Sequence, residues 1–203
     1  MAGPDTESAA TTNSPPTTAE LTAATAATAA TAKSGAEVGA VAPWYRSKAP
    51  ARPKPRALAV TTATSIVALV VLVAVGRLLG ETVLIPPLAA SMALVAGGSA
   101  LPLAQPRNVI GGQLVSALVA FIVLAIAGSS AWGAAVAGGL ALGAMLLLRV
   151  SHSPGAATAV MVVLERPEIV RFLALLLLAT VILVAVAVIS ARANRTVYPV
   201  YWW

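Results

Sequence analysis

The sequence contains no cysteine and a single histidine, His152, and these two scarcities restrict the chemistry open to it. Without cysteine there is no disulfide, no thiolate metal site and no cysteine nucleophile. Charged residues make up only 10% of the chain, against about a quarter in soluble domains. Catalysis would need an acid–base pair, a metal cluster or a nucleophile beside its base, and only Ser151 and Ser153 adjoin the histidine. We therefore expect no enzyme, no cofactor and no metal.

Apolar residues make up 59% of the chain, and they gather in runs. After Ala57 these runs reach roughly the 20 residues that cross a bilayer. The net charge of +6 could suggest nucleic acid, but five basic residues lie just before the first apolar run, where positive charge holds a loop in the cytoplasm. They are Arg46, Lys48, Arg52, Lys54 and Arg56. We expect this chain to be surrounded by a lipid bilayer and to bind no nucleic acid.

Composition divides the chain into three regions. Residues 1–55 are expected to be a disordered, Ala/Thr-rich cytoplasmic tail, because they cannot bury enough apolar surface to offset the entropy of ordering. Residues 56–191 form the transmembrane domain, and residues 192–203 an aromatic C-terminal tail. The first region has neither the early basic segment nor the apolar core of a signal peptide. A transit peptide is the less favoured alternative, since acidic residues precede the first arginine.

Six apolar elements are predicted in the transmembrane domain. They cover residues 57–79, 84–103, 109–127, 132–148, 154–164 and 169–190. The fifth would give only about 16 Å of helix, so it spans a hydrocarbon core of roughly 30 Å only together with an extended stretch at 150–153. Six crossings place Arg192 and Arg195 on the cytoplasmic side with most other arginines, which favours that topology. A re-entrant fifth element is the alternative.

A nine-residue motif occurs twice, at residues 87–95 and 154–162, which are 67 positions apart. Each copy begins with proline and carries a hydroxyl residue, Ser91 or Thr158, four positions later. Paired, interrupted apolar segments in corresponding halves indicate the binding site of transporters built from inverted repeats. We predict an all-α, polytopic integral membrane protein of about six elements, arranged as an inverted 3+3 repeat with two short proline-started helices. A chance repeat in an Ala-rich chain is the alternative.

Two segments resemble the HPP family of integral membrane proteins. Residues 102–112 read Pro-Leu-Ala-Gln-Pro-Arg-Asn-Val-Ile-Gly-Gly, which is similar to the family signature. Residues 152–159 read His-Ser-Pro-Gly-Ala-Ala-Thr-Ala and resemble the His-Pro-Pro segment that names the family. The resemblance extends from about residue 57 to residue 203. Two positions depart from it: Ser153 replaces the first proline, and Gln113 stands where many members carry histidine.

The resemblance implies transport, because members of the family in chloroplasts and cyanobacteria have been linked to nitrite. We therefore expect a transporter or channel for a small inorganic anion, with nitrite as one candidate substrate. The alternative is a structural or accessory membrane subunit that transports nothing. A bacterial plasma membrane is expected from the Ala-rich, cysteine-free composition, with an organelle membrane as the alternative. Gly138, Gly139 and Gly143 would serve either internal packing or a homo-oligomer contact.

The expected anion site lies where the two proline-started helices begin. A helix N-terminus offers unpaired N–H groups and a partial positive charge, and glycine lets a ligand come close to the backbone. His152 could bind the anion or take up a proton with it. The predicted site residues are Pro87, Ser91, His152, Ser153, Pro154, Gly155 and Thr158, with Gln105, Arg107 and Asn108 as a vestibule. For the small residues, the alternative is that they only permit tight helix packing. For His152, the alternative is a buried imidazole that is hydrogen-bonded to the protein and has no role in transport.

Overall fold

The computed structural model describes residues 52–202, and within that range every regular element is a helix. The elements are α2 (Pro55–Leu79), α3 (Pro86–Gly97), the 3₁₀ turn η1 (Pro102–Ala104), α4 (Pro106–Ala127), α5 (Ala131–Leu147), α6 (Ser153–Glu165) and α7 (Ile169–Ala193). The predicted all-α fold class is confirmed. Most of the predicted N-terminal tail, residues 1–51, lies outside the described residues.

The starts of the helices follow from local sequence. Proline occupies the first turn of α2, α3, α4 and α6, where its fixed φ suits a helix and its missing N–H costs no hydrogen bond. The other two helices are capped by side chains. Ser130 Oγ accepts a bond from Gly133 N at the start of α5, and the Glu168 carboxylate accepts from Val170 N and Arg171 N at the start of α7.

Three of the helices are long and apolar enough to cross a membrane: α2, α4 and α7. The others have 12, 17 and 13 residues. At 1.5 Å per residue they span about 18, 26 and 20 Å, less than a hydrocarbon core of roughly 30 Å. The predicted second element, 84–103, is too long, because α3 ends at Gly97 and Pro102 begins a separate turn. The expectation of about six elements holds, but only three of them are full-length helical spans.

Large apolar side chains cover the outside of the bundle. Val70, Ile122, Leu146 and Ile189 are each at least 59% exposed. Such a surface is unfavourable in water, whereas in lipid it costs nothing. Alanine is the commonest buried apolar residue, with buried alanines on α4, α5 and α7, and leucine, valine and methionine side chains fill the rest of the interior. Both features fit a helical protein embedded in a bilayer.

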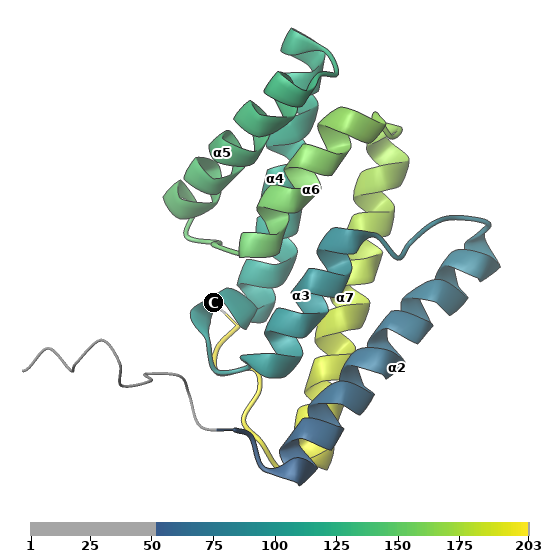
Figure 1. Ribbon diagram of the computed structural model, residues 1–203, viewed down its shortest axis with the longest axis vertical. Coiled ribbons are helices and arrows are strands. Elements are labelled where there is room, and N and C mark those ends of the chain that lie inside the picture. Colours follow the sequence, from purple (N-terminus) through teal and green to yellow (C-terminus); the bar gives the residue numbers. More distant parts are fainter. Residues whose placement is uncertain (1–51, 203) are drawn as a thin grey trace, which may run out of the picture. The chain divides into compact units, whose positions relative to one another are not determined.

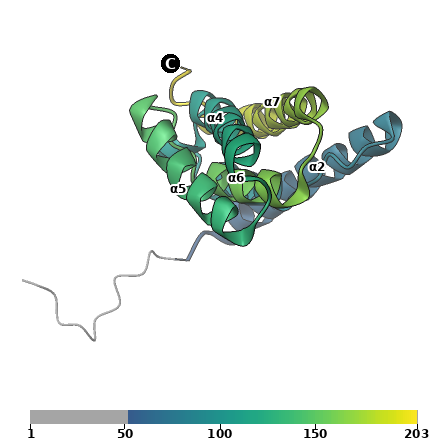
Figure 2. The ribbon, with the colours of Figure 1, turned by 90° about the horizontal axis from the view of Figure 1, so that it is seen from above.

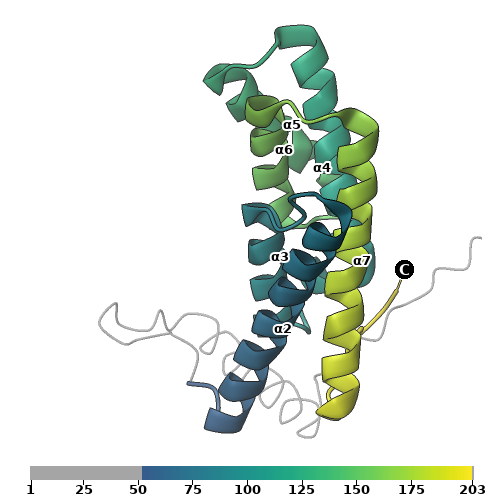
Figure 3. The same ribbon diagram turned by 90° about the vertical axis from the view of Figure 1, so that its right-hand side faces the viewer.

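The two short helices α3 and α6 begin near the middle of the described bundle and run away from each other in opposite directions (Figures 1 and 3). On either side of them, α2 and α5 lie at opposite edges of the bundle (Figures 1 and 2). The long helix α4 packs along α6, and the long helix α7 packs along α3. Each half of the chain therefore has a peripheral helix, a half-length helix and a long central helix.

Helix packing has the pattern of an inverted repeat. α2 packs on α3 and α7 just as α5 packs on α6 and α4, and α3 packs on α7 as α6 packs on α4. The two remaining major contacts, α3 with α6 and α4 with α7, join each element to its counterpart. Exchanging the halves thus leaves this set of helix pairs unchanged, as the inverted 3+3 arrangement requires.

Burial repeats with the same spacing of 67 residues. All five buried positions of α3 (87, 88, 91, 92 and 95) correspond to buried positions of α6 (154, 155, 158, 159 and 162). In α4, six buried positions (109, 112, 113, 116, 117 and 120) correspond to six in α7 (176, 179, 180, 183, 184 and 187). A chance resemblance of one nine-residue motif would not extend the register into the following long helices.

The close crossing of α4 and α6 depends on two glycines. A Cβ at Gly112 would lie 2.5 Å from the Cβ of His152 and 2.7 Å from the carbonyl oxygen of Val150. A Cβ at Gly155 would lie 2.6 Å from Ser116 Oγ and 3.0 Å from the carbonyl oxygen of Gly112. Contacts this short leave no space for a side chain, so glycine is what allows the two backbones to approach.

Gly112→Ala is expected to lower the stability of the folded protein by about 1–3 kcal/mol, because the added methyl overpacks a rigid contact. The measurement is the unfolding transition in detergent, followed by circular dichroism. Gly139→Ala is the matched control, since nothing lies within 4 Å of its Cβ position on α5. Equal shifts in the two variants would contradict the role given to the α4–α6 crossing.

Candidate functional site

His152 is the residue that immediately precedes α6, and its side chain is fully buried. Its Nδ1 lies 2.8 Å from the carbonyl oxygen of Leu103, in the turn before α4. Because a carbonyl oxygen can only accept, Nδ1 carries a hydrogen and donates it. On the other side of the ring, Nε2 lies 2.8 Å from Ser91 Oγ on α3. The histidine therefore connects the starts of both half-length helices.

Two further buried side chains extend this contact. Gln113 Nε2, on α4, donates to Ser91 Oγ at 2.8 Å, and the Gln113 Oε1 accepts a short hydrogen bond from Thr158 Oγ1 on α6. None of the four side chains has exposed surface. We call Ser91, Gln113, His152 and Thr158 the polar cluster. It lies among three helices in a bundle whose interior is otherwise mostly apolar.

The polar cluster can satisfy either charge state of the imidazole without moving a heavy atom. Ser91 has one hydroxyl hydrogen and two acceptors in reach, His152 Nε2 and, at 2.9 Å, the carbonyl oxygen of Pro87. With a neutral ring, the hydroxyl donates to Nε2. With a protonated ring, Nε2–H donates to Ser91 Oγ and the hydroxyl turns to Pro87. A proton can therefore be accepted at His152 by rotating one hydroxyl group.

The backbone at the two helix starts differs from the sequence expectation of free N–H groups. Proline occupies two positions at the start of α3 and one at the start of α6, and proline has no N–H. The N–H of Leu88 donates to the carbonyl of Ile85, and that of Gly155 to the carbonyl of His152. These starts therefore contribute their dipole, while the hydrogen-bond donors around them come from side chains of the polar cluster.

The structure brings most of the predicted site residues together. Pro87 and Pro154 are buried at the starts of α3 and α6, and Ser91 and Thr158 lie one turn further along. Ser153, the first residue of α6, is exposed. The space beside Gly155 is filled by Ser116 and by the backbone of α4. A ligand at this site would therefore meet the polar cluster and not the backbone of Gly155.

The predicted elements 84–103 and 109–127 leave Arg107 and Asn108 between them, but in the structure both residues belong to α4, which begins at Pro106. Gln105 is buried, and its Nε2 donates to the carbonyls of Ser99 and Leu101. Asn108 Nδ2 donates to the carbonyl of Pro102 at 2.9 Å. The two amides thus fix the turn that carries Leu103, the partner of His152.

Arg107 and Asn108 also line a cavity of about 460 Å³. Its wall consists of Pro102, Arg107, Asn108, Arg149, Ser151 and Tyr201. Two arginines at one small cavity create a positive potential suited to an anion. Ser151 in this wall adjoins His152 in the chain, so the cavity lies next to the segment that carries the histidine. The vestibule role of Arg107 and Asn108 stays a prediction, with Arg149 as an additional member.

Gln113 is the functional candidate that sequence reasoning left out of the site. It was noted only as a departure from a family pattern, although it bridges Ser91 and Thr158 in the structure. The signal was available, since a glutamine inside an apolar span has to find a polar partner. Its partners were not predictable, because α3 and α6 meet α4 through contacts far apart in sequence.

These observations define a class: a multi-pass helical membrane protein with two opposed half-length helices and a buried polar cluster between them. A family model described as "HPP, transmembrane region" matches residues 50–199. The chain therefore belongs to the HPP transmembrane family, as the resemblance predicted. The cluster includes the histidine of the motif that names the family.

Two curated relatives are described as transmembrane proteins of Dictyostelium discoideum. One is 34% identical over 130 residues, which cover 60% of this chain and 46% of that protein. The other is 33% identical over 133 residues, which cover 61% of this chain and 43% of the relative. The chain thus spans less than half the length of these relatives. No solved structure matches it.

Thr158→Val is expected to destabilise the protein by about 1–3 kcal/mol, since it leaves the buried Gln113 carbonyl without its donor. Thr180→Val is the matched control. Thr180 is also a buried helical threonine, but its hydroxyl bonds only the Leu177 carbonyl of its own helix. Thermal unfolding in detergent measures both variants. A loss in Thr180→Val as large as in Thr158→Val would argue against an interhelical role for the cluster.

Proposed function

We propose that this protein is a membrane transporter or channel for a small inorganic anion, with nitrite as the first candidate substrate. The observation that carries the proposal is the polar cluster, which places hydroxyl, amide and imidazole groups at two opposed helix starts. Polar and ionisable groups inside a membrane bundle are costly, and their usual role is in a substrate or ion pathway. The positive ends of two helix dipoles face the same region and favour negative charge there.

The donors of the cluster match the needs of an oxyanion. The amide of Gln113, the hydroxyls of Ser91 and Thr158 and the imidazole of His152 can each donate a hydrogen bond. The arginines at the neighbouring cavity, Arg107 and Arg149, supply long-range attraction at its mouth. An anion that reaches the cluster would exchange protein hydrogen bonds of the cluster for its own.

Proton uptake with the anion follows from the two hydrogen-bond arrangements of Ser91. A protonated His152 would offset the negative charge of the substrate inside the bundle. Symport of a proton with the anion would make the transported pair neutral overall, which lowers the cost of crossing an apolar interior.

His152→Gln is expected to retain part of the nitrite uptake into proteoliposomes but to lose its dependence on pH, since glutamine forms hydrogen bonds without titrating. Uptake is followed with a nitrite-sensitive electrode. Thr180→Val, which removes a buried hydroxyl outside the polar cluster, is expected to keep the wild-type pH profile. A His152→Gln protein whose pH profile is that of the wild type would remove the histidine from the mechanism.

A structural or accessory subunit is the competing function, and one observation favours it. Every member of the polar cluster has a protein partner, so the cluster is also able to hold three helices together without any ligand. The purified protein in liposomes distinguishes the two functions, because a subunit moves no nitrite, nitrate, formate or chloride by itself.

The type of membrane and the oligomeric state are proposed from composition and from the exposed surface of α5. Lipid is its environment, and a bacterial plasma membrane is the membrane that its composition favours. A homo-oligomer would pack through α5, where Gly139 and Gly143 are exposed with no neighbour within 4 Å of their Cβ positions. Gly138 instead faces Val160 of α6 at 3.1 Å and serves internal packing.

A further inference from the structure

A second cavity of the described bundle lies away from the polar cluster, between α2, α3, α7 and the chain that follows α7. It has a volume of about 880 Å³. Its wall combines small apolar residues with hydroxyl groups, including Thr61 and Thr64 on α2, Ala96 on α3 and Ser190 on α7. Three cations also line it: Lys54, Arg56 and Arg195. We call this space the N-side cavity, since it opens where α2 begins.

The N-side cavity leads toward the polar cluster along one helix. Val95 lines the cavity and lies on α3 one helical turn after Ser91, so the two side chains share a face of that helix. The cations stand at the first residues of α2 and just after the end of α7, which is the outer end of the cavity. An anion would meet positive charge first, then hydroxyl groups, and then the cluster.

The internal repeat supplies a direct comparison, because the α3 and α7 parts of this cavity have counterparts on α6 and α4. With the spacing of 67 residues, Val95 and Ala96 correspond to Val162 and Val163. By the same spacing, Ala187 and Ser190 of α7 correspond to Ala120 and Val123 of α4. All four counterparts belong to the packed hydrophobic core.

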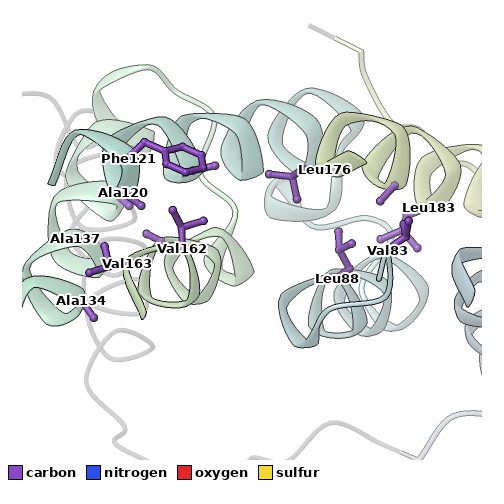
Figure 4. Close-up of a cluster of buried hydrophobic side chains, with 14 of the residues drawn as sticks. Val83, Leu88, Ala120, Phe121, Ala134, Ala137, Val162, Val163, Leu176 and Leu183 are labelled. Atoms are coloured by element: carbon purple, nitrogen blue, oxygen red, sulfur yellow. The ribbon is translucent and has the colours of Figure 1, made fainter. Parts of the chain in front are cut away.

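The corresponding space is filled in the second half. Figure 4 shows Ala120, Phe121, Val162 and Val163 lying near one another, and all four belong to one hydrophobic core cluster. On α5, a Cβ at Gly133 would already lie 3.7 Å from Val163 Cγ1. Val95 and Ala187 are themselves buried, so the two sides differ at Ala96 and Ser190, which are half-buried where their counterparts Val163 and Val123 are buried. The three-helix arrangement is therefore open beside Ala96 of α3 and packed beside Val163 of α6. In transporters built from inverted repeats, access alternates as one repeat moves against the other around a fixed site.

We propose that the N-side cavity is the access chamber for the anion on the membrane face where α2 begins, and that the packed region among α4, α5 and α6 is the matching chamber in its closed state. The proposal rests on the proposed anion transport, and it specifies a carrier with alternating access. When the α3 side closes, the α6 side opens, and the polar cluster between them faces the opposite membrane surface.

Cysteine accessibility tests the two chambers, and the natural sequence is a ready background because it contains no cysteine. Ala96→Cys and Val163→Cys form a matched pair at corresponding positions of α3 and α6. Each is treated in right-side-out and in inverted vesicles with a membrane-impermeant thiol reagent, with and without sodium nitrite. The proportion of labelled protein is then measured after purification.

Ala96→Cys is expected to label from the face where α2 begins, and Val163→Cys from the opposite face. Added nitrite is expected to shift the two labelling rates in opposite directions. Val163→Cys that stays unlabelled from both faces while nitrite uptake is intact would overturn the proposal, as would an unlabelled Ala96→Cys. Opposite labelling without any nitrite uptake would instead support the two chambers and count against nitrite transport.

The cations of the chamber give an independent test. Arg195→Gln is expected to raise the KM for nitrite uptake several-fold with little change in maximal rate, and to weaken the dependence of uptake on ionic strength. Arg192→Gln is the control, because Arg192 lies in the last turn of α7 but does not line the cavity. Equal effects of the two substitutions would contradict the chamber, since they would report only the charge of that membrane face.

Discussion

A helix that begins inside a membrane bundle has to satisfy polar groups where water is scarce, and this constraint explains much of the structure. Backbone groups that are left unpaired in hydrocarbon cost several kcal/mol each. Here α3 and α6 both begin at the middle of the bundle, with prolines where N–H groups would otherwise be unpaired. His152 supplies further hydrogen bonds at this depth, because Nδ1 donates to the Leu103 carbonyl and Nε2 bonds Ser91 Oγ. The glycine crossing of α4 and α6 is needed because only a close approach brings Gln113 to Thr158.

The internal repeat explains where the residues of the polar cluster lie, and the differences between its two halves explain why the cluster is not symmetric. Ser91 and Thr158 occupy corresponding positions, and both bond Gln113. The counterpart of Gln113 is Thr180, which bonds only its own helix, so one long helix carries the polar bridge and the other does not. His152 likewise corresponds to Ile85. A symmetric framework thus holds an asymmetric set of side chains.

Much of the architecture was predictable from the sequence, because apolar runs and prolines act locally. The starts of α3 and α6 were expected from Pro87 and Pro154, and the 67-residue motif indicated the inverted arrangement. The length of α3 was overestimated, since hydropathy alone does not distinguish a helix from the apolar turn that follows Gly97. The partners of His152 were not predictable, because Leu103 and Ser91 are 49 and 61 residues away in the chain. The packing role of Gly155 was not predictable either, because it depends on where α4 lies.

The C-terminal segment is connected to His152 through hydrogen bonds to the turn before α4. Tyr198 donates its hydroxyl hydrogen to the carbonyl of Ala104, and Val200 N–H donates to Gln105 Oε1. Both contacts hold the turn whose Leu103 carbonyl accepts from His152. A displacement of Tyr198 or Val200 would therefore shift the Leu103 carbonyl, and the hydrogen bond that His152 donates would change with it. The segment after α7 thus belongs to the environment of the histidine, as α3 and α6 do.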